Sequence, residues 1–342
     1  MLGRRHLLPA IGRGLLSMPD RGAHGLIIRE LDSWIRLEFL GVMVHSGVAD
    51  ALAQPRTAEE IISETATADH ELLEALLALG VSLRELRKSN GRYSIRGRRL
   101  RAVTGNSSDL RGLVEELVVY DNPVYSALRA HLRGQPAQPY DADHGAVIAA
   151  ASRVAEPILG PTVRAFAGEV QPARVLDIGC GSGVYLRHVL EVERASIGVG
   201  IDLDHAAVAA AAVHLADLRE DARCEVRHGD IEAVAGDLGE FDLVLLMNNI
   251  YYWPPERRAD VLRKIRSCMA PGGGLLLASA TPDGQPFSRH LDVMLRVTSG
   301  SHRLPTAQEL ESDLRSAGLV DVAVLEPVPK SGLVVATARR PG

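Results

Sequence analysis

The chain has 342 residues, of which 46% are hydrophobic and 24% charged, and its formal net charge at pH 7 is -5. A single hydrophobic core seldom organises so long a chain, so two domains are expected. The charge balance gives no long-range attraction to nucleic acid or an anionic membrane, aromatic residues are scarce at 4%, and no apolar run reaches the roughly 18 residues of a membrane span, so neither partner is expected.

Residues 1–105 have the pattern of a mostly helical domain. Helical spacing of apolar residues, or a helix cap, predicts helices over residues 26–53, 58–65 and 71–79. The tetrapeptide at 57–60 is a capping box, and Gly80 is expected to stop the third helix. Asn90-Gly91 between two extended runs predicts a β-hairpin. Three helices followed by a hairpin are typical of a winged helix.

Residues 106–165 read as a helical linker, with helices over 109–132 and 146–166 around a Gly/Pro-containing stretch at 134–139. From residue 166 to residue 342 the pattern alternates between strand and helix. The alternating segments are 175–178, 183–192, 195–201, 205–215, 224–228, 242–247, 255–268, 274–280, 307–317, 320–325 and 333–339. This alternation predicts an α/β domain with a mostly parallel sheet and helices on both faces.

A glycine loop follows the first strand of this domain. Three alternate glycines, Gly179, Gly181 and Gly183, let the backbone approach a ligand that a Cβ atom would block. Their GxGxG spacing differs from the GxGxxG of dinucleotide binders, and the loop lacks the Gly-Lys-Ser/Thr ending of a P-loop. Asp177, two residues before the first glycine, would repel a pyrophosphate. It suits a cationic ligand that carries an ammonium group.

Two further acids end the next two strands. Asp202 follows the second strand, where a carboxylate can accept hydrogen bonds from both hydroxyls of a ribose. Asp230 follows the third strand, where the amino group of an adenine would lie. The three acids together therefore indicate a ligand that contains adenosine and an ammonium group.

In this combination the sequence resembles the class I S-adenosylmethionine-dependent methyltransferases, over about residues 175–339. The resemblance implies a Rossmann-like domain with a seven-stranded, mostly parallel sheet, S-adenosyl-L-methionine as cofactor and S-adenosyl-L-homocysteine as product. It assigns Asp177 and the glycine loop to the methionine end of the cofactor, Asp202 to the ribose and Asp230 to N6 of adenine. The remaining residues that it assigns to cofactor binding are Leu203 and Ile231, beside the adenine, and Asn248, after the fourth strand.

The first domain carries few groups suited to DNA. A winged helix usually reads DNA with a basic third helix, but residues 57–80 contain no Lys or Arg and six acids: Glu59, Glu60, Glu64, Asp69, Glu71 and Glu74. The segment resembles the N-terminal dimerisation domain of small-molecule O-methyltransferases. That resemblance implies a homodimer, with residues 1–105 as winged-helix dimerisation domain, 106–165 as a helical linker lining the substrate pocket and 166–342 as the catalytic domain.

The segment expected to contact the methyl acceptor differs from the pattern of the O-methyltransferases. Their catalytic base is a His in a His-Asp-Trp segment after strand four, and alignment on Trp253 puts Tyr251 in the place of the His. Tyr251 or Tyr252 could polarise or deprotonate an acceptor, or contact the sulfonium by a cation–π interaction. The Asn-x-x-Tyr spacing of Asn248 and Tyr251 also resembles the Asn-Pro-Pro-Tyr motif of amino-group methyltransferases. The third reading is that the aromatic side chains only form a pocket wall.

Asn249 and His302 complete the candidate catalytic residues beside Tyr251. The 2-oxo acid C-methyltransferases have the same two-domain plan, and some bind a metal through a His-Asp pair and a distant His. His302 lies near the place of that distant His, but the segment from Asn249 to Trp253 offers no other ligand, so no metal is expected. Further candidate pocket residues are His144, Arg153, His290 and Arg296.

The leading hypothesis is a homodimeric, cytoplasmic methyltransferase that acts on a small-molecule acceptor in specialised metabolism, by direct displacement without the usual catalytic His. The three cysteines form no CxxC pair, which fits a reducing cytosol. Methylation of carbon or nitrogen rather than oxygen is one alternative. Others are a non-methylating reaction with the same cofactor, and a non-enzymatic, cofactor-sensing winged-helix regulator.

Overall fold

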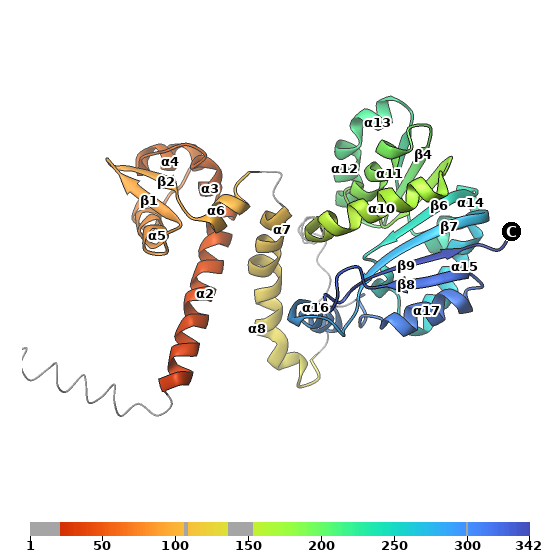
Figure 1. The fold of residues 1–342 in the computed structure, drawn as a ribbon. Coiled ribbons are helices and arrows are strands. Elements are labelled where there is room, and N and C mark those ends of the chain that lie inside the picture. The colour runs from red at the N-terminus through yellow and green to blue at the C-terminus, as the bar shows by residue number, and fades with distance from the viewer. Residues whose placement is uncertain (1–20, 106–108, 136–152, 299) are drawn as a thin grey trace, which may run out of the picture. The chain divides into compact units, whose positions relative to one another are not determined.

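The computed structural model describes residues 21–105, 109–135, 153–298 and 300–342 (Figure 1). The chain divides into two compact units, Met1–Asn106 and Ser107–Gly342. None of the helices within the described ranges is both long and apolar enough to cross a membrane.

The first unit is built from helices and one hairpin. Its elements are α2 (Arg21–His45), α3 (Val48–Ala51), α4 (Ala58–Thr65), α5 (His70–Ser82), β1 (Leu86–Ser89), β2 (Arg92–Ile95) and α6 (Arg98–Val103). The two strands pair in antiparallel register. Asn90 and Gly91 both have positive φ, at 50° and 74°, as a two-residue hairpin turn requires.

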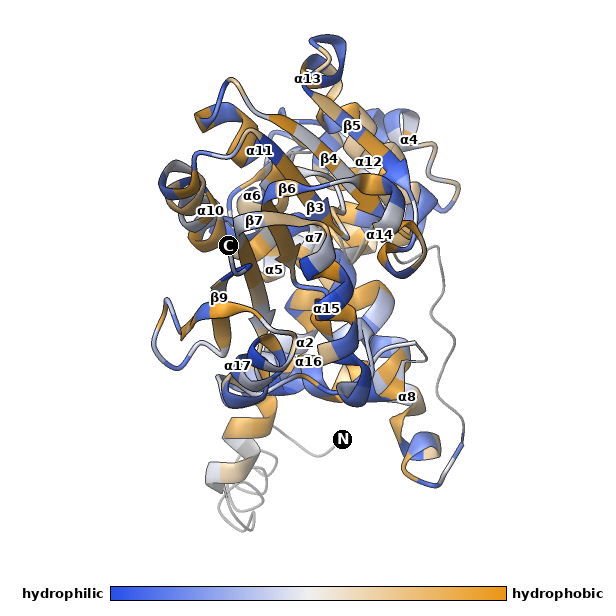
Figure 2. Cartoon of the chain, turned by 90° about the vertical axis from the view of Figure 1, so that its right-hand side faces the viewer, coloured by the Kyte–Doolittle hydropathy of each residue, from blue (hydrophilic) through white to orange (hydrophobic). Residues whose placement is uncertain are grey.

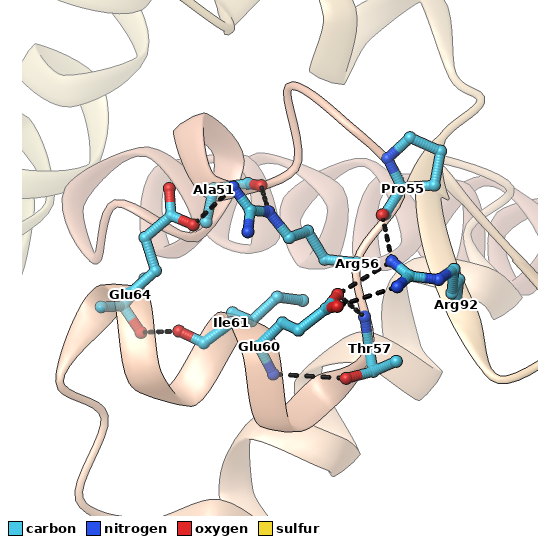
Figure 3. Close-up of polar contacts among 9 residues, drawn as sticks. Ala51, Pro55, Arg56, Thr57, Glu60, Ile61, Glu64 and Arg92 are labelled. Atoms are coloured by element: carbon cyan, nitrogen blue, oxygen red, sulfur yellow. Dashed lines mark hydrogen bonds and ion pairs between the residues drawn. The ribbon is translucent and has the colours of Figure 1, made fainter.

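The capping box predicted for α4 is present and also anchors the hairpin (Figure 3). The Glu60 backbone N–H donates to Thr57 Oγ1 at 3.3 Å, and the Glu60 carboxylate accepts from the Thr57 N–H at 2.9 Å. Arg92, on β2, donates to both oxygens of the same carboxylate and to the Pro55 carbonyl. The Glu60 carboxylate therefore accepts a backbone N–H at the start of α4 and also holds the hairpin against that helix.

Two predicted helix boundaries in this unit are wrong. The helix expected over 26–53 is interrupted after His45, because Gly47 takes a left-handed conformation with φ 75°. The helix expected to stop at Gly80 continues to Ser82. A Cβ atom on Gly80 would lie 2.6 Å from Phe39 Cζ and 2.7 Å from Leu86 Cδ1. Gly80 is thus a site of close packing and does not terminate the helix.

We predict that Gly80→Ala lowers the free energy of unfolding by about 1–3 kcal/mol, because overpacking outweighs the gain in helix propensity. Gly25→Ala is the matched control, since a Cβ on Gly25 in α2 meets no atom within 4 Å. Urea unfolding of both variants measures the effect. A Gly80→Ala protein as stable as the control would contradict the packing explanation.

The second unit contains a seven-stranded sheet. Its strands are β3 (Arg174–Ile178), β4 (Ile197–Asp202), β5 (Cys224–His228), β6 (Phe241–Met247), β7 (Met269–Ala280), β8 (Val320–Leu325) and β9 (Leu333–Arg339). Their order is β5-β4-β3-β6-β7-β9-β8. Only β9 runs antiparallel to its neighbours β7 and β8. The predicted α/β fold with a mostly parallel, seven-stranded sheet is confirmed.

Helices cover both faces of the sheet (Figure 1). The helices between the strands are α11 (Val184–Val192), α12 (His205–His214), α13 (Ala216–Glu220), α14 (Ile231–Leu238), α15 (Arg258–Ser267) and α17 (Ala307–Ser316), and α10 (Glu156–Val170) precedes the first strand. Side chains of α10 and α11 pack into one apolar core on the sheet, and those of α14, α15 and α17 into another. In Figure 2 the strands are largely orange and α17 mostly blue, as expected of a buried sheet under amphipathic helices.

The remaining elements are irregular or were not predicted. They are α7 (Asp109–Glu115), the π-helical segment η1 (Glu116–Asp121), α8 (Asn122–His131), the 3-10 turns η3 (Arg153–Ala155), η4 (Ile250–Tyr252) and η5 (Pro255–Arg257), and α16 (Pro286–Val297). The sequence predicted one helix over 109–132, which a π-helical turn interrupts. It did not predict α14 or α16. Much of the expected linker at 134–139 and the first part of the helix expected over 146–166 lie outside the described residues.

Candidate active site

The candidate site lies at the carboxyl edge of the sheet, where the strand order reverses. β3 pairs with β4 on one side and with β6 on the other. Open parallel sheets bind their ligands in the crevice beyond such a reversal point. The glycine loop follows β3 directly, so the fold places it there.

The three loop glycines all have positive φ, at 62°, 53° and 75°. A Cβ on Gly179 would lie 2.4 Å from Asn249 Nδ2, and one on Gly183 would lie 2.6 Å from Leu215 Cδ1. A Cβ on Gly181 would meet no atom within 4 Å. The outer two glycines therefore permit close packing, and the middle one borders open space from which a ligand can approach the backbone.

Asp177 lies beneath this loop with only 1% of its surface exposed. Neither carboxylate oxygen has a hydrogen-bond partner among the described residues. Burial raises the pKa of Asp177 to about 8, and the nearby charge of Asp202 adds to the effect. An unpaired buried carboxyl group is costly and commonly marks a functional site. It is suited to accept hydrogen bonds from an ammonium group.

Asp202 is half-buried at the end of β4 and organises the backbone around it. Its Oδ2 accepts from the Gly181 N–H at 2.8 Å, and its Oδ1 accepts from the Asp204 N–H at 2.9 Å. The carboxylate thus holds the open middle of the glycine loop. A carboxylate offers about four lone-pair sites, so both oxygens retain capacity for the predicted ribose hydroxyls.

The predicted adenine side is more exposed. Asp230 caps α14, since its Oδ1 accepts from the Glu232 N–H at 2.9 Å. The Leu203 side chain is 67% exposed, whereas Ile231 is buried in the core. His228 Nε2 lies 2.9 Å from the Leu203 carbonyl oxygen. The His228 ring stacks on the His205 ring, with the two ring centroids 3.7 Å apart. No sequence pattern predicts this histidine pair, although His228 is the last residue of β5.

Asn249 lies against the glycine loop, a position that the sequence did not indicate. Its side chain is buried, its Nδ2 donates to the Ile178 carbonyl, and it fills the space beside Gly179. Asn248 precedes it with φ 57°, and the Asn248 N–H donates to the Ala278 carbonyl at 2.8 Å. The pair connects the ends of β3, β6 and β7.

The structure brings together two other predicted residues, Tyr251 and His302. Tyr251 is buried in η4, with its ring 5.1 Å from that of Tyr252. The His302 N–H donates to the Tyr251 carbonyl at 2.9 Å. Arg258, which is completely buried, donates to the carbonyls of Trp253 and Arg303. These contacts hold the segment after β6 against the segment around residue 302.

The comparisons with known proteins agree with this geometry. Residues 175–273 match a family described as a methyltransferase domain. The ubiquinone biosynthesis O-methyltransferase of Acinetobacter baylyi is 26% identical over 161 residues, which are 45% of this chain and 66% of that protein. The match therefore spans slightly less than two thirds of that relative's length.

Two solved structures have the same fold over nearly the whole chain. An O-methyltransferase family protein from Burkholderia thailandensis has a TM-score of 0.74 and 20% identity, covering 92% of this chain and 97% of that one. Human N-acetylserotonin methyltransferase, in complex with S-adenosylmethionine, has a TM-score of 0.76 and 17% identity, covering 95% and 99%.

Residues 175–273 of the second unit thus match a methyltransferase domain, and the chain shares its fold with solved methyltransferases. The predicted resemblance is confirmed, with the glycine loop of the methyltransferase domain at the carboxyl edge of its sheet.

The other predicted pocket residues of the methyltransferase lie in several places. His144 and the side chain of Arg153 lie outside the described residues. Arg296 pairs with Asp292 on α16 at 2.8 Å, and His290 contacts Asp121. Within the described ranges, no group of three or more His, Cys, Asp or Glu side chains is arranged to hold a metal ion.

We predict that Asp177→Asn removes a pH-dependent loss of folding stability from the ligand-free protein. Because the folded-state pKa is about 8 and the unfolded value is about 3.9, the folded protein retains a proton that the unfolded chain loses. Asp177 therefore makes wild-type stability decline as the pH rises from about 4 to about 8. Relative to wild type, the variant should gain about 1–3 kcal/mol between pH values of about 5 and 8.

Urea unfolding of the two proteins at both pH values measures this difference. Asp237→Asn, at an exposed position in α14, is the control and should follow the wild type. A variant whose stability differs from the wild type equally at both pH values would show that Asp177 does not titrate in this range.

Proposed function

We propose that the protein is a methyltransferase that binds S-adenosyl-L-methionine, releases S-adenosyl-L-homocysteine and methylates a small molecule. The observation that carries this proposal is the buried, unpartnered Asp177 carboxyl group beneath a glycine loop whose middle residue borders open space. This arrangement suits the ammonium group of an amino acid moiety. The methyltransferase family match over residues 175–273 supports it independently.

We assign the residues of the site to four parts of that cofactor. Asp177 would accept from the ammonium group, the Gly181 region would pass close to the methionine chain, and Asp202 would accept from the ribose hydroxyls. Leu203, with its exposed side chain, would cover the adenine, and Asp230 would accept from N6. Ile231 would contribute indirectly, by packing in the core beneath the adenine side. Asn248 would contribute through its backbone, which fixes the loop after β6.

The cofactor supplies an already activated methyl group on a sulfonium. The protein's main task is then to hold the acceptor in line and to exclude water. We assign this task to the segment from Asn249 to Tyr251 and to His302, whose backbone contacts hold the two segments together. Asn249 would act by positioning the loop, and Tyr251 would line the site in place of the family's usual His. A role in specialised metabolism is supported by the fold shared with small-molecule methyltransferases.

We predict that Asp202→Ala weakens binding of S-adenosylhomocysteine by about 1–3 kcal/mol, because ligand hydroxyls lose a buried acceptor. Isothermal titration calorimetry measures the affinity, with Asp237→Ala as the control at an exposed position of the same unit. Wild-type protein that binds neither S-adenosylmethionine nor S-adenosylhomocysteine would rule out the proposed function. An unchanged affinity in Asp202→Ala would rule out the ribose assignment alone.

We also propose a homodimer, formed through the first unit. Helix α2 carries a set of exposed apolar side chains: Leu26, Ile27, Ile28, Leu31, Trp34 and Val42. Exposed apolar patches of this kind are typical of interaction surfaces. The resemblance of this unit to dimerisation domains favours a second copy of the chain as the partner. A cytoplasmic location is supported by three cysteines that are all buried and free.

We predict that Trp34→Ser raises the dimer dissociation constant by tenfold or more, since burial of a large side chain contributes about 1.5–3 kcal/mol. Size-exclusion chromatography with light scattering over a range of concentrations measures it. Asp32→Ser changes an exposed polar residue of the same helix and should leave the dimer intact. A monomeric wild type, or a Trp34→Ser protein that dimerises normally, would contradict the assignment of this surface.

A further inference from the structure

A histidine–carboxylate pair lies on the helices that follow and pack near the end of β7, and the proposed function gives it no role. His290 of α16 places its Nε2 2.8 Å from Asp121 Oδ2 in η1. The Asp121 carboxylate is buried. On the other side of the ring, the Tyr125 hydroxyl of α8 lies 2.9 Å from His290 Nδ1, and the two rings are parallel with centroids 5.5 Å apart.

The hydrogen-bonding capacities of these groups fix the direction of the bond to Asp121 and, for a neutral imidazole, of the bond to Tyr125. An ionised carboxylate only accepts, so His290 Nε2 carries the proton that Asp121 receives. In the neutral form of the imidazole, Nδ1 is then the lone-pair nitrogen, and the Tyr125 hydroxyl donates to it. In that form a buried carboxylate orients the ring, which presents its basic nitrogen to a phenolic O–H. This is the arrangement of a general base and its orienting acid.

The π-helical turn explains how η1 reaches α16. In a π-helix, residues five apart are hydrogen-bonded neighbours, so Glu116 and Asp121 lie on one face of η1. Burial, together with the charge of Asp121, raises the pKa of Glu116 to about 8. At neutral pH Glu116 is therefore mostly protonated, and Asp121 is the carboxylate that faces His290. The adjacent Tyr120 hydroxyl lies 2.9 Å from Thr298 Oγ1, at the end of α16, which holds η1 and α16 together.

The same helix connects this pair to the acceptor side of the site. α16 begins six residues after β7 ends, at the carboxyl edge of the sheet. Asp292 Oδ1, on α16, accepts from the Leu304 N–H at 2.8 Å. The neighbouring His302 N–H donates to Tyr251. A base on α16 would therefore lie on the side of the sheet edge where Tyr251 has replaced the family's usual His.

We propose that His290 Nδ1, oriented by Asp121, is the proton acceptor for a phenolic or enolic hydroxyl of the methyl acceptor, which takes the place of the Tyr125 hydroxyl. This inference rests on the proposed function and names its substrate class. The acceptor O–H bond breaks, an N–H bond forms at Nδ1, and the electron pair stays on oxygen as a phenolate. Tyr125 is 48% exposed, so its ring can move aside without opening the core.

The chemistry of the base selects this class of acceptor. Imidazole accepts protons near neutral pH, and a phenol with a pKa of about 10 lies within its reach. An aliphatic alcohol is too weak an acid to be ionised by imidazole, and a neutral amine already offers a lone pair and needs no base. The groups that face His290 are Asp121 from η1 and Tyr125 from α8, with Phe287 beside it on α16.

The test uses 4-nitrophenol, whose phenolate absorbs visible light whereas the neutral phenol does not. The full-length protein is saturated with S-adenosylhomocysteine, and absorbance is followed as the pH is varied. In the wild type, the bound probe should ionise about one pH unit lower than the free probe, because the imidazolium and Asp121 stabilise the ion pair. His290→Gln should abolish this shift, and Asp121→Asn should reduce it.

Two further variants separate a proton acceptor from a structural contact. Tyr125→Phe should preserve the shift and tighten probe binding, since it removes the competing hydroxyl, and loss of the shift would overturn the proposal. His131→Gln, in α8, should behave as wild type. The folding of each variant is checked by its affinity for S-adenosylhomocysteine.

Different results would overturn the assignment of His290 and the proposed function. Wild-type protein that binds S-adenosylhomocysteine but neither binds nor ionises the probe would overturn the assignment of His290 and leave the proposed function standing. A shift that survives in His290→Gln would overturn it as well. Wild-type protein that binds no S-adenosylhomocysteine would remove the proposed function, and this inference with it.

Discussion

A carboxyl group buried without a partner imposes the main constraint on the second unit. Asp177 is 1% exposed, and within the described residues only the Leu186 backbone N–H lies near enough to lower its pKa, without a well-formed hydrogen bond to either oxygen. The surrounding backbone must therefore be held in place by other contacts. Asp202 binds the Gly181 N–H from β4, and Asn249 packs beside Gly179 and donates to the Ile178 carbonyl from the end of β6. The sheet thus bears the cost of an unpaired buried carboxyl group, a feature that is typical of functional sites.

The sequence predicted the parts of the fold that depend on local patterns. Strands such as β3 and β6 are mostly apolar, as is typical of buried parallel strands, and the glycine loop is a contiguous motif. Helix α14 was missed because it spans only eight residues and follows an acid already assigned to a ligand. Helix α16 was missed although Pro286 at its first position is a helix-start signal, because its apolar side becomes visible only through packing with Val124 and Leu128 of α8. Gly80 was misread because a packing glycine and a helix-ending glycine look the same in one sequence.

In the site, too, the sequence predicted the residues that follow local patterns and not the contacts between residues far apart in the chain. The cofactor-side acids follow consecutive strands, so their spacing along the chain predicted the edge at which Asp177 and Asp202 meet. The contacts on the acceptor side join residues that are far apart. His290 and Asp121 are 169 positions apart, and their meeting depends on a π-helical turn that no sequence pattern announced. The sequence named His290 only as one of several pocket residues, because a lone His on a helix gives no sign of its partner.

The two sides of the site also differ in what holds them. Asp177 and Asp202 stand at the ends of strands whose backbones are fixed by ladders on both sides. The groups of the acceptor side stand on α8, α16, η1 and the segments around residues 251 and 302, which side chains such as Arg258, Asp292 and Thr298 join. Helices joined in this way can shift relative to a sheet at less cost than strands can shift within it. A fold of this kind can keep one cofactor while the position of a base moves from the end of β6 to a helix after β7. The Tyr251 substitution and the His290–Asp121 pair are consistent with such a relocation.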